Sequence, residues 1–89
     1  MKIDRLVDCF DSAIDHEKEY VAIMVKIPNC IKPEIIIQHK ENLLEKIQYY
    51  RNSYNSDCEL NSNKSVKLIA CTNTNKLASL DRWVKSIEA

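Results

Sequence analysis

The stretch YVAIMVKI, residues 20–27, decides the fold because it is short, rich in β-branched side chains and almost entirely apolar. Successive side chains of a strand point to opposite faces, so both faces of this strand are apolar. Such a strand belongs in the middle of a sheet that is covered, at least in part, on both sides. Pro28 ends the strand, because proline has no amide hydrogen to donate to a neighbouring strand.

Segments after this strand complete a small sheet. Residues 34–38 (EIIIQ) and 66–72 (VKLIACT) predict two further strands, and residues 29–32, between two prolines, predict a loop. Residues 58–60 are compatible with a short extended piece, and residues 61–64 predict a polar turn. We therefore expect a three-stranded antiparallel sheet in the order 2-1-3, with the most apolar strand in the centre.

Three segments have apolar side chains at the three- and four-residue spacing of a helix. They are residues 3–17, a segment from residue 40 or 42 to residue 54, and residues 76–88. Asn42 and Glu45 resemble a capping box at the start of the second segment. The element order is then α-β-β-α-β-α, and residues 1–89 are expected to form one α+β domain with three helices packed on the sheet.

The composition excludes several classes of functional site. The chain has 13 Lys and Arg, 13 Asp and Glu, and no glycine. Phosphate-binding loops, dinucleotide fingerprints, nucleophile elbows and EF-hand loops need glycine where the backbone turns sharply or approaches a ligand. No carboxylate has a recognisable catalytic partner in the sequence. We therefore expect no enzymatic activity, no catalytic residue and no cofactor.

The four cysteines, Cys9, Cys30, Cys58 and Cys71, include no C-x-x-C pair and have no metal-finger spacing to the two histidines. Cys9 and His16 lie on one predicted helix, about 10 Å apart along its axis, which is too far for a thiol–imidazole contact. No metal site is predicted. Because no signal-peptide or membrane-spanning pattern is present, we expect a cytoplasmic protein with reduced, mostly buried thiols and an exposed Cys30.

An acidic row marks the first predicted helix, on a flank away from its apolar stripe. It consists of Asp4, Asp8, Asp11 and Asp15. Residues 1–19 carry six acidic and three basic residues, so the neutral total conceals a charge of −3 there and +3 in the remainder. Such a row can dock on a partner's basic patch by mimicking the spacing of phosphates. The alternative is a solvated helix face with acids near a helix N-terminus.

Aromatic residues cluster at the end of the second predicted helix. Tyr50 and Tyr54 fall on the apolar stripe and are expected in the core, which leaves Tyr49 and Arg51 outside. Tyrosine and arginine are common anchors of protein interfaces, so these two residues are candidates for a second partner contact. Stacking of nucleic-acid bases on tyrosine is the other interpretation.

A nucleic-acid-binding module is the alternative function. It would use the basic residues of the remainder, and these would have to converge on one face. They are Lys40, Lys46, Arg51, Lys64, Lys67, Arg82 and Lys85.

Residues 20–72 resemble small proteins encoded by phages and prophages of low-GC Gram-positive bacteria. The residues that carry the resemblance are Pro33, Glu34, Ile35, Ile36, Ile37, Asn42, Tyr49, Tyr50 and Tyr54. Gln38 and His39 depart from this pattern, which has Asn-Pro at these positions. The resemblance implies no activity. It implies a protein that binds host or phage components, a setting that includes inhibitors of bacterial defence systems such as anti-CRISPR proteins.

The function that we predict is therefore a small non-enzymatic protein-binding domain whose partner is another protein with a basic patch. Its expected binding residues are the four aspartates of the acidic row together with Tyr49 and Arg51. A membrane partner is not expected. Ile35, Ile36 and Ile37 place apolar side chains on both faces of an edge strand, which favours pairing with another strand. A two-fold homodimer, formed by edge pairing or by helix faces, and a monomer both stay open.

Overall fold

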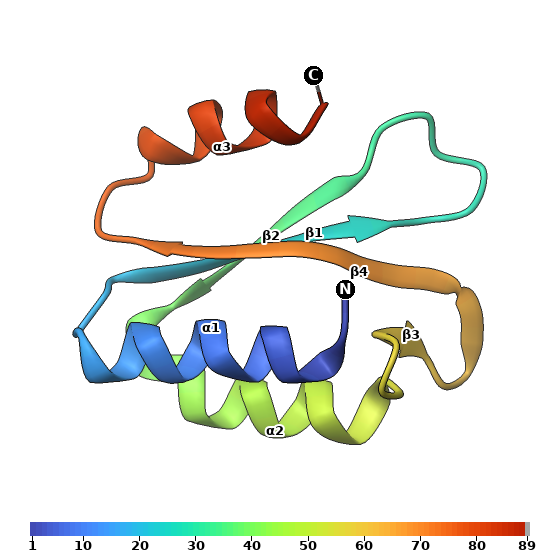
Figure 1. The fold of residues 1–89 in the computed structure, drawn as a ribbon, viewed down its shortest axis with the longest axis horizontal. Helices are drawn as coiled ribbons and strands as arrows, with labels where there is room; N and C mark the ends of the chain where they lie inside the picture. Colours follow the sequence, from blue (N-terminus) through green and yellow to red (C-terminus); the bar gives the residue numbers. More distant parts are fainter. Residues whose placement is uncertain (89) are drawn as a thin grey trace.

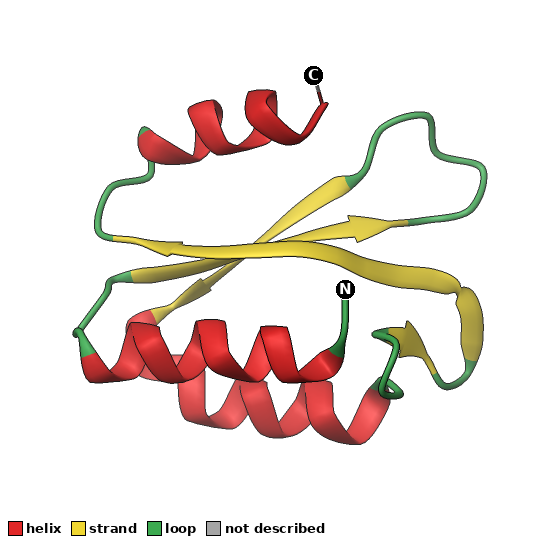
Figure 2. Cartoon of the chain, in the orientation of Figure 1, coloured by secondary structure: helices red, strands yellow, loops and turns green. Residues whose placement is uncertain are grey.

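The computed structural model describes residues 1–88, which form three α-helices and one four-stranded sheet (Figures 1 and 2). In chain order the elements are α1 (Ile3–Asp15), β1 (Tyr20–Lys26), β2 (Glu34–His39), the one-turn 3-10 helix η1 (Lys40–Asn42), α2 (Leu43–Ser53), β3 (Glu59–Leu60), β4 (Asn63–Thr74) and α3 (Ser79–Glu88). The prediction of an α+β fold with three helices and an antiparallel sheet is confirmed.

The strand β1 lies inside the sheet, between β2 and β4. Ile23 at its centre is paired with Ile36 of β2 on one side and with Cys71 of β4 on the other. The short strand β3 pairs with the far side of β4, and the sheet order is β2-β1-β4-β3. The predicted sheet of three strands and its order are therefore wrong, because a fourth strand lies beyond β4.

The fourth strand was missed because polar residues form part of this hairpin. β4 has 12 residues and begins at Asn63, whereas its apolar pattern begins only at Val66. Ladder hydrogen bonds join backbone groups, so an exposed polar side chain is no obstacle to pairing. Leu60 is paired with Asn63, and Glu59 with Lys67, whose Nζ atom lies 3.2 Å from Glu59 Oε2.

The helices cover both faces of the sheet (Figure 1). α1 and α2 lie side by side and antiparallel on one face, and α3 lies on the other. The main core fills the space between the sheet and the α1–α2 layer, and its most buried members include Leu6, Phe10, Ile23, Leu43 and Leu68. On the opposite face of β1, Ala22 and Met24 are also fully buried. The apolar character of both faces of β1 thus has a structural reason.

The end of α1 is a tight turn made without glycine. The Lys18 amide donates to the Ala13 carbonyl oxygen at 2.8 Å, and the Glu17 amide donates to that of Ile14 at 3.3 Å. This is the Schellman arrangement, which places one residue in the left-handed region, most often glycine. Glu17 occupies that position with a φ of 52°. The helix therefore ends at Asp15, two residues earlier than predicted.

The starts of the other two helices also differ from the prediction. Asn42 makes no side-chain capping bond, so the predicted capping box is wrong. The 3-10 turn η1 instead leads directly into α2. α3 begins at Ser79 rather than at residue 76, after a turn in which the Lys76 amide donates to Thr74 Oγ1 at 3.1 Å.

Candidate functional site

The four aspartates of the acidic row project from the side of α1 that faces away from the sheet. We call this surface the aspartate face; it consists of Asp4, Asp8, Asp11 and Asp15, all of them exposed. Spacings of four, three and four residues keep the side chains on one face, opposite the buried side chains of the helix. At about 1.5 Å of rise per residue, the row is about 16 Å long.

No described basic residue forms an ion pair with the aspartate face. Arg5 is adjacent to Asp4 in the sequence but forms no ion pair with it, and Lys2 pairs with Asp57 of the loop after α2 instead. This hydrogen bond and the attraction between the opposite charges raise the pKa of Lys2 and lower that of Asp57. Among residues 1–88, no ion pair therefore neutralises a carboxylate of the aspartate face.

The backbone beneath the aspartate face is held against β4. Asn73 Nδ2 donates to the Cys9 carbonyl oxygen at 3.0 Å, and Cys71 Sγ lies 3.9 Å from the Arg5 carbonyl oxygen. Both contacts reach main-chain atoms of α1, so the helix packs closely on the strand. The carboxylates are thus carried by a helix anchored at its middle and closed by the Schellman turn at its end.

Tyr49 and Arg51 lie on different flanks of α2, although both are exposed. Tyr49 is 52% exposed, contacts Tyr50 edge-on with 5.2 Å between ring centroids, and has Lys46 Nζ 5.9 Å from its own ring centroid. Arg51 is seven residues after Leu44, which lines a crevice beside α1, so Arg51 belongs to the flank facing α1. The structure therefore does not bring Tyr49 and Arg51 together.

The other two tyrosines of the cluster belong to the core, as predicted. Tyr50 and Tyr54 are buried, and burial raises the pKa of both phenols. Tyr50 also accepts a hydrogen bond from Gln38 Nε2 of β2 at 3.1 Å. These rings join α2 to the sheet and are not available for base stacking.

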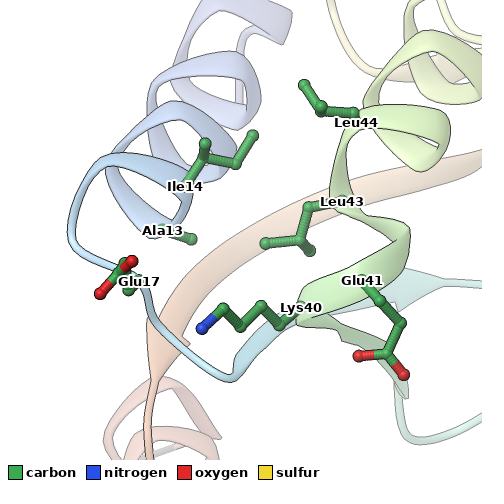
Figure 3. Close-up of a pocket in the computed structure, with 7 residues that line it drawn as sticks. All are labelled: Ala13, Ile14, Glu17, Lys40, Glu41, Leu43 and Leu44. Atoms are coloured by element: carbon green, nitrogen blue, oxygen red, sulfur yellow. The ribbon is translucent and has the colours of Figure 1, made fainter.

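A crevice of about 200 Å³ lies between the end of α1 and the start of α2 (Figure 3). Ala13, Ile14, Leu43 and Leu44 give it apolar walls. In Figure 3 the Lys40 side chain extends toward Glu17 across one end, whereas Glu41 points away. Sequence reasoning missed this crevice. Its one signal is the adjacent pair of leucines, because successive residues of a helix point about 100° apart, so that the second leucine can lie at the edge of the buried face.

The thiols divide as predicted into three buried and one exposed. Cys9, Cys58 and Cys71 are buried, and Cys30 is exposed in the loop between β1 and β2. No hydrogen bond joins a cysteine to a histidine among the described residues, and His16 Nδ1 lies 2.9 Å from the Ser12 carbonyl oxygen. Cys9 of α1 and Cys71 of β4 lie on the two facing sides where these elements pack, which the spacing in the sequence did not indicate.

The basic residues proposed for nucleic-acid binding do not converge. Lys40, Lys46 and Arg51 belong to η1 and α2 on one face of the sheet, and Arg82 and Lys85 belong to α3 on the other. Beside Arg82, at the start of α3, is a hollow of about 320 Å³ that Lys76, Ala78 and Ser79 also line.

Within residues 1–88, no three His, Cys, Asp or Glu side chains are grouped so that they would hold a metal ion. The described helices include none with the length and apolar character needed to cross a membrane. Comparison with known proteins finds no matching family model, curated protein or solved structure. The resemblance to phage and prophage proteins therefore stays a prediction from the sequence.

Proposed function

We propose that this chain is a small non-enzymatic domain that binds another protein in the cytoplasm by docking its aspartate face on a basic patch. The observation that carries the proposal is the row of four exposed carboxylates, with no described ion-pair partner, on one face of an anchored helix. Because these carboxylates have no described ion-pair partner, few existing interactions have to be broken when a complementary surface docks on them. The row of like charges also accelerates the encounter with a positively charged partner.

The partner that fits best is a protein whose basic surface otherwise holds nucleic acid. A row of carboxylates on a helix presents regularly spaced negative charges, as a phosphate backbone does. The resemblance to phage proteins supports a bacterial host component as the partner, such as a nuclease of a defence system. The domain then acts as an inhibitor of the anti-CRISPR kind, by occupying the nucleic-acid site.

The test compares two charge-reversed double variants with the unchanged chain. Asp8→Lys with Asp11→Lys reverses the centre of the aspartate face, and Glu34→Lys with Asp81→Lys makes the same change in net charge on β2 and α3. Each tagged chain is used to capture partners from a lysate of a low-GC Gram-positive bacterium, after circular dichroism has verified its folding. We expect the first variant to bind the captured protein at least about tenfold more weakly and the second to bind normally.

Two outcomes contradict the proposal. Equal capture by all three chains would remove the aspartate face from the interface. Equal loss in both variants would mean that only net charge matters. Raised salt should weaken capture by the unchanged chain, because exposed ion pairs are screened.

A further inference from the structure

Cys9 and Cys71 meet where α1 packs on β4. Cys9 belongs to the buried side of α1, and Cys71 belongs to the face of β4 that α1 covers. Cys71 Sγ is 3.9 Å from the carbonyl oxygen of Arg5, one turn before Cys9. Asn73, two residues along the same face of β4, has its Nδ2 atom 4.0 Å from Cys9 Sγ. The two thiols therefore face one another across the packing of α1 on β4.

The two thiols of this pair are chemically different. The neighbouring Cys71 thiol, together with the nearby Arg5 charge and Asn73, lowers the pKa of Cys9. The proximity of Cys9, together with burial, raises the pKa of Cys71. Cys9 is therefore the more acidic thiol of the pair. A thiol of lowered pKa beside a second thiol that can resolve it is the arrangement found in many redox-sensitive cysteines.

Access from solvent also separates this pair from the other buried thiol. Cys9 and Cys71 are 6% and 8% exposed, whereas Cys58 is fully buried. Burial raises the pKa of Cys58, so that thiol stays protonated and unreactive. Cys30 is exposed, but it lies in the loop between β1 and β2 and not beside the pair.

We propose that Cys9 and Cys71 form an oxidisable dithiol that reacts with peroxides to give an intramolecular disulfide between α1 and β4. The Cys9 thiolate attacks one oxygen of hydrogen peroxide, the O–O bond breaks, and hydroxide leaves while Cys9 becomes a sulfenic acid. The Cys71 sulfur then attacks the Cys9 sulfur. The S–S bond forms, the S–O bond breaks, and the departing oxygen leaves as water. In total, two thiols and one peroxide give one disulfide and two waters.

The disulfide would fasten α1 to the sheet without covering the aspartate face, which lies on the opposite side of the helix. The loop that it closes spans most of the chain, so the crosslink strongly restricts the unfolded state. We expect the midpoint of thermal unfolding to rise by about 10 °C on oxidation and to return on reduction.

The experiment treats the folded full-length Cys30→Ser chain with hydrogen peroxide and follows its intact mass. Trypsin cleaves after lysine and arginine, so Cys9 falls in residues 6–18, Cys71 in residues 68–76 and Cys58 in residues 52–64. We expect the mass to fall by two hydrogen atoms. Unreduced digests should contain the first two peptides joined, and dithiothreitol should separate them.

Two further variants of the Cys30→Ser chain test which thiols form the crosslink. Cys58→Ala should leave the crosslink unchanged. Cys71→Ser should prevent it and leave Cys9 as a sulfenic acid, which dimedone traps. A crosslink to Cys58, oxidation of Cys58 before Cys9, or crosslinking no faster in the folded chain than in urea would each overturn the proposal. If Cys71→Ser fails to fold, the proposal is judged on two results from the Cys30→Ser chain. These are the cysteines joined in its mapped crosslink, and the rate of crosslinking in the folded chain compared with the rate in urea.

Discussion

Glu17 is the residue at which the lack of glycine causes the clearest backbone strain. The Schellman turn after α1 holds it at a φ of 52°, where a side chain with a Cβ atom is strained. Asn29 and Cys58 also have positive φ, so three non-glycine residues take left-handed positions among residues 1–88. This strain is independent of any contact that the three side chains make.

Replacing Glu17 with glycine should therefore stabilise the fold. We expect Glu17→Gly to raise the free energy of unfolding by about 1 kcal/mol, because relief of strain exceeds the added entropy of the unfolded chain. Glu19→Gly, two residues later at a negative φ, should lower it instead. Urea unfolding followed by circular dichroism measures both changes. A loss of stability in both variants would show that the left-handed turn is not strained.

Tyr50 predicts how stability depends on pH at the alkaline end. Its folded-state pKa is raised, chiefly by burial, so the unfolded chain loses this proton first. The stability contributed by the neutral phenol is complete below about pH 10 and is lost as the pH rises through the folded-state value. At neutral pH, Tyr50→Phe should lower the free energy of unfolding by about 1 kcal/mol, because Gln38 loses its acceptor. Above about pH 10, the free energy of unfolding of this variant should fall less with rising pH than that of the unchanged chain. Urea titrations at neutral and alkaline pH, with exposed Tyr49→Phe as control, measure this.

At the scale of the element, the two leucines that begin α2 show which side of this helix is packed in the core and which side is exposed. Leu43 is 1% exposed and Leu44 is 71% exposed, although they are neighbours with the same side chain. Leu43→Ala should cost about 3 kcal/mol of unfolding free energy, since it leaves a cavity in the main core. Leu44→Ala should change it by less than about 0.5 kcal/mol. Comparable losses in the two variants would mean that α2 is rotated from the position described.

The outer edge of β2 is the element on which self-association depends. β2 ends the sheet on one side, and Ile37 is exposed there, whereas Ile36 packs against the core. Pairing of two β2 edges would bury these isoleucines and join two sheets antiparallel across a two-fold axis. Ile37→Lys places a charge on the edge without disturbing the core. If edge pairing operates, sedimentation should show a dimer for the unchanged chain and a monomer for this variant. A concentration-independent mass near 10.4 kDa for the unchanged chain would exclude it.

At the scale of the whole molecule, the distribution of charge argues against nucleic-acid binding. The cations of α2 and α3 lie on opposite faces of the sheet, so they do not form one continuous basic surface for a nucleic-acid strand. We expect neither single- nor double-stranded DNA to bind at low salt. A fluorescence titration at two salt concentrations checks this. Binding whose log K falls by about 0.7 to 0.9 per neutralised phosphate for each tenfold rise in salt would establish the alternative function.

Much of the architecture was already determined by the sequence. Hydrophobic periodicity identified the three helices, the apolar strand at the centre of the sheet and the buried Tyr50 and Tyr54, because burial of a side chain follows directly from the 3.6- and two-residue periods. The exposed aspartate face followed from the same periodicity. These features are local in sequence, so a single sequence is enough to predict them.

The tertiary structure alone decided which distant residues meet. β3 pairs through backbone atoms, which carry no side-chain signal, and the Cys9–Cys71 contact joins residues from opposite ends of the chain. The crevice at Leu44 and the separation of Tyr49 from Arg51 depend on how α2 is turned against α1. Periodicity specifies which side of an element is buried, but it contains no information about which other element covers that side. That choice is made by packing of the whole chain.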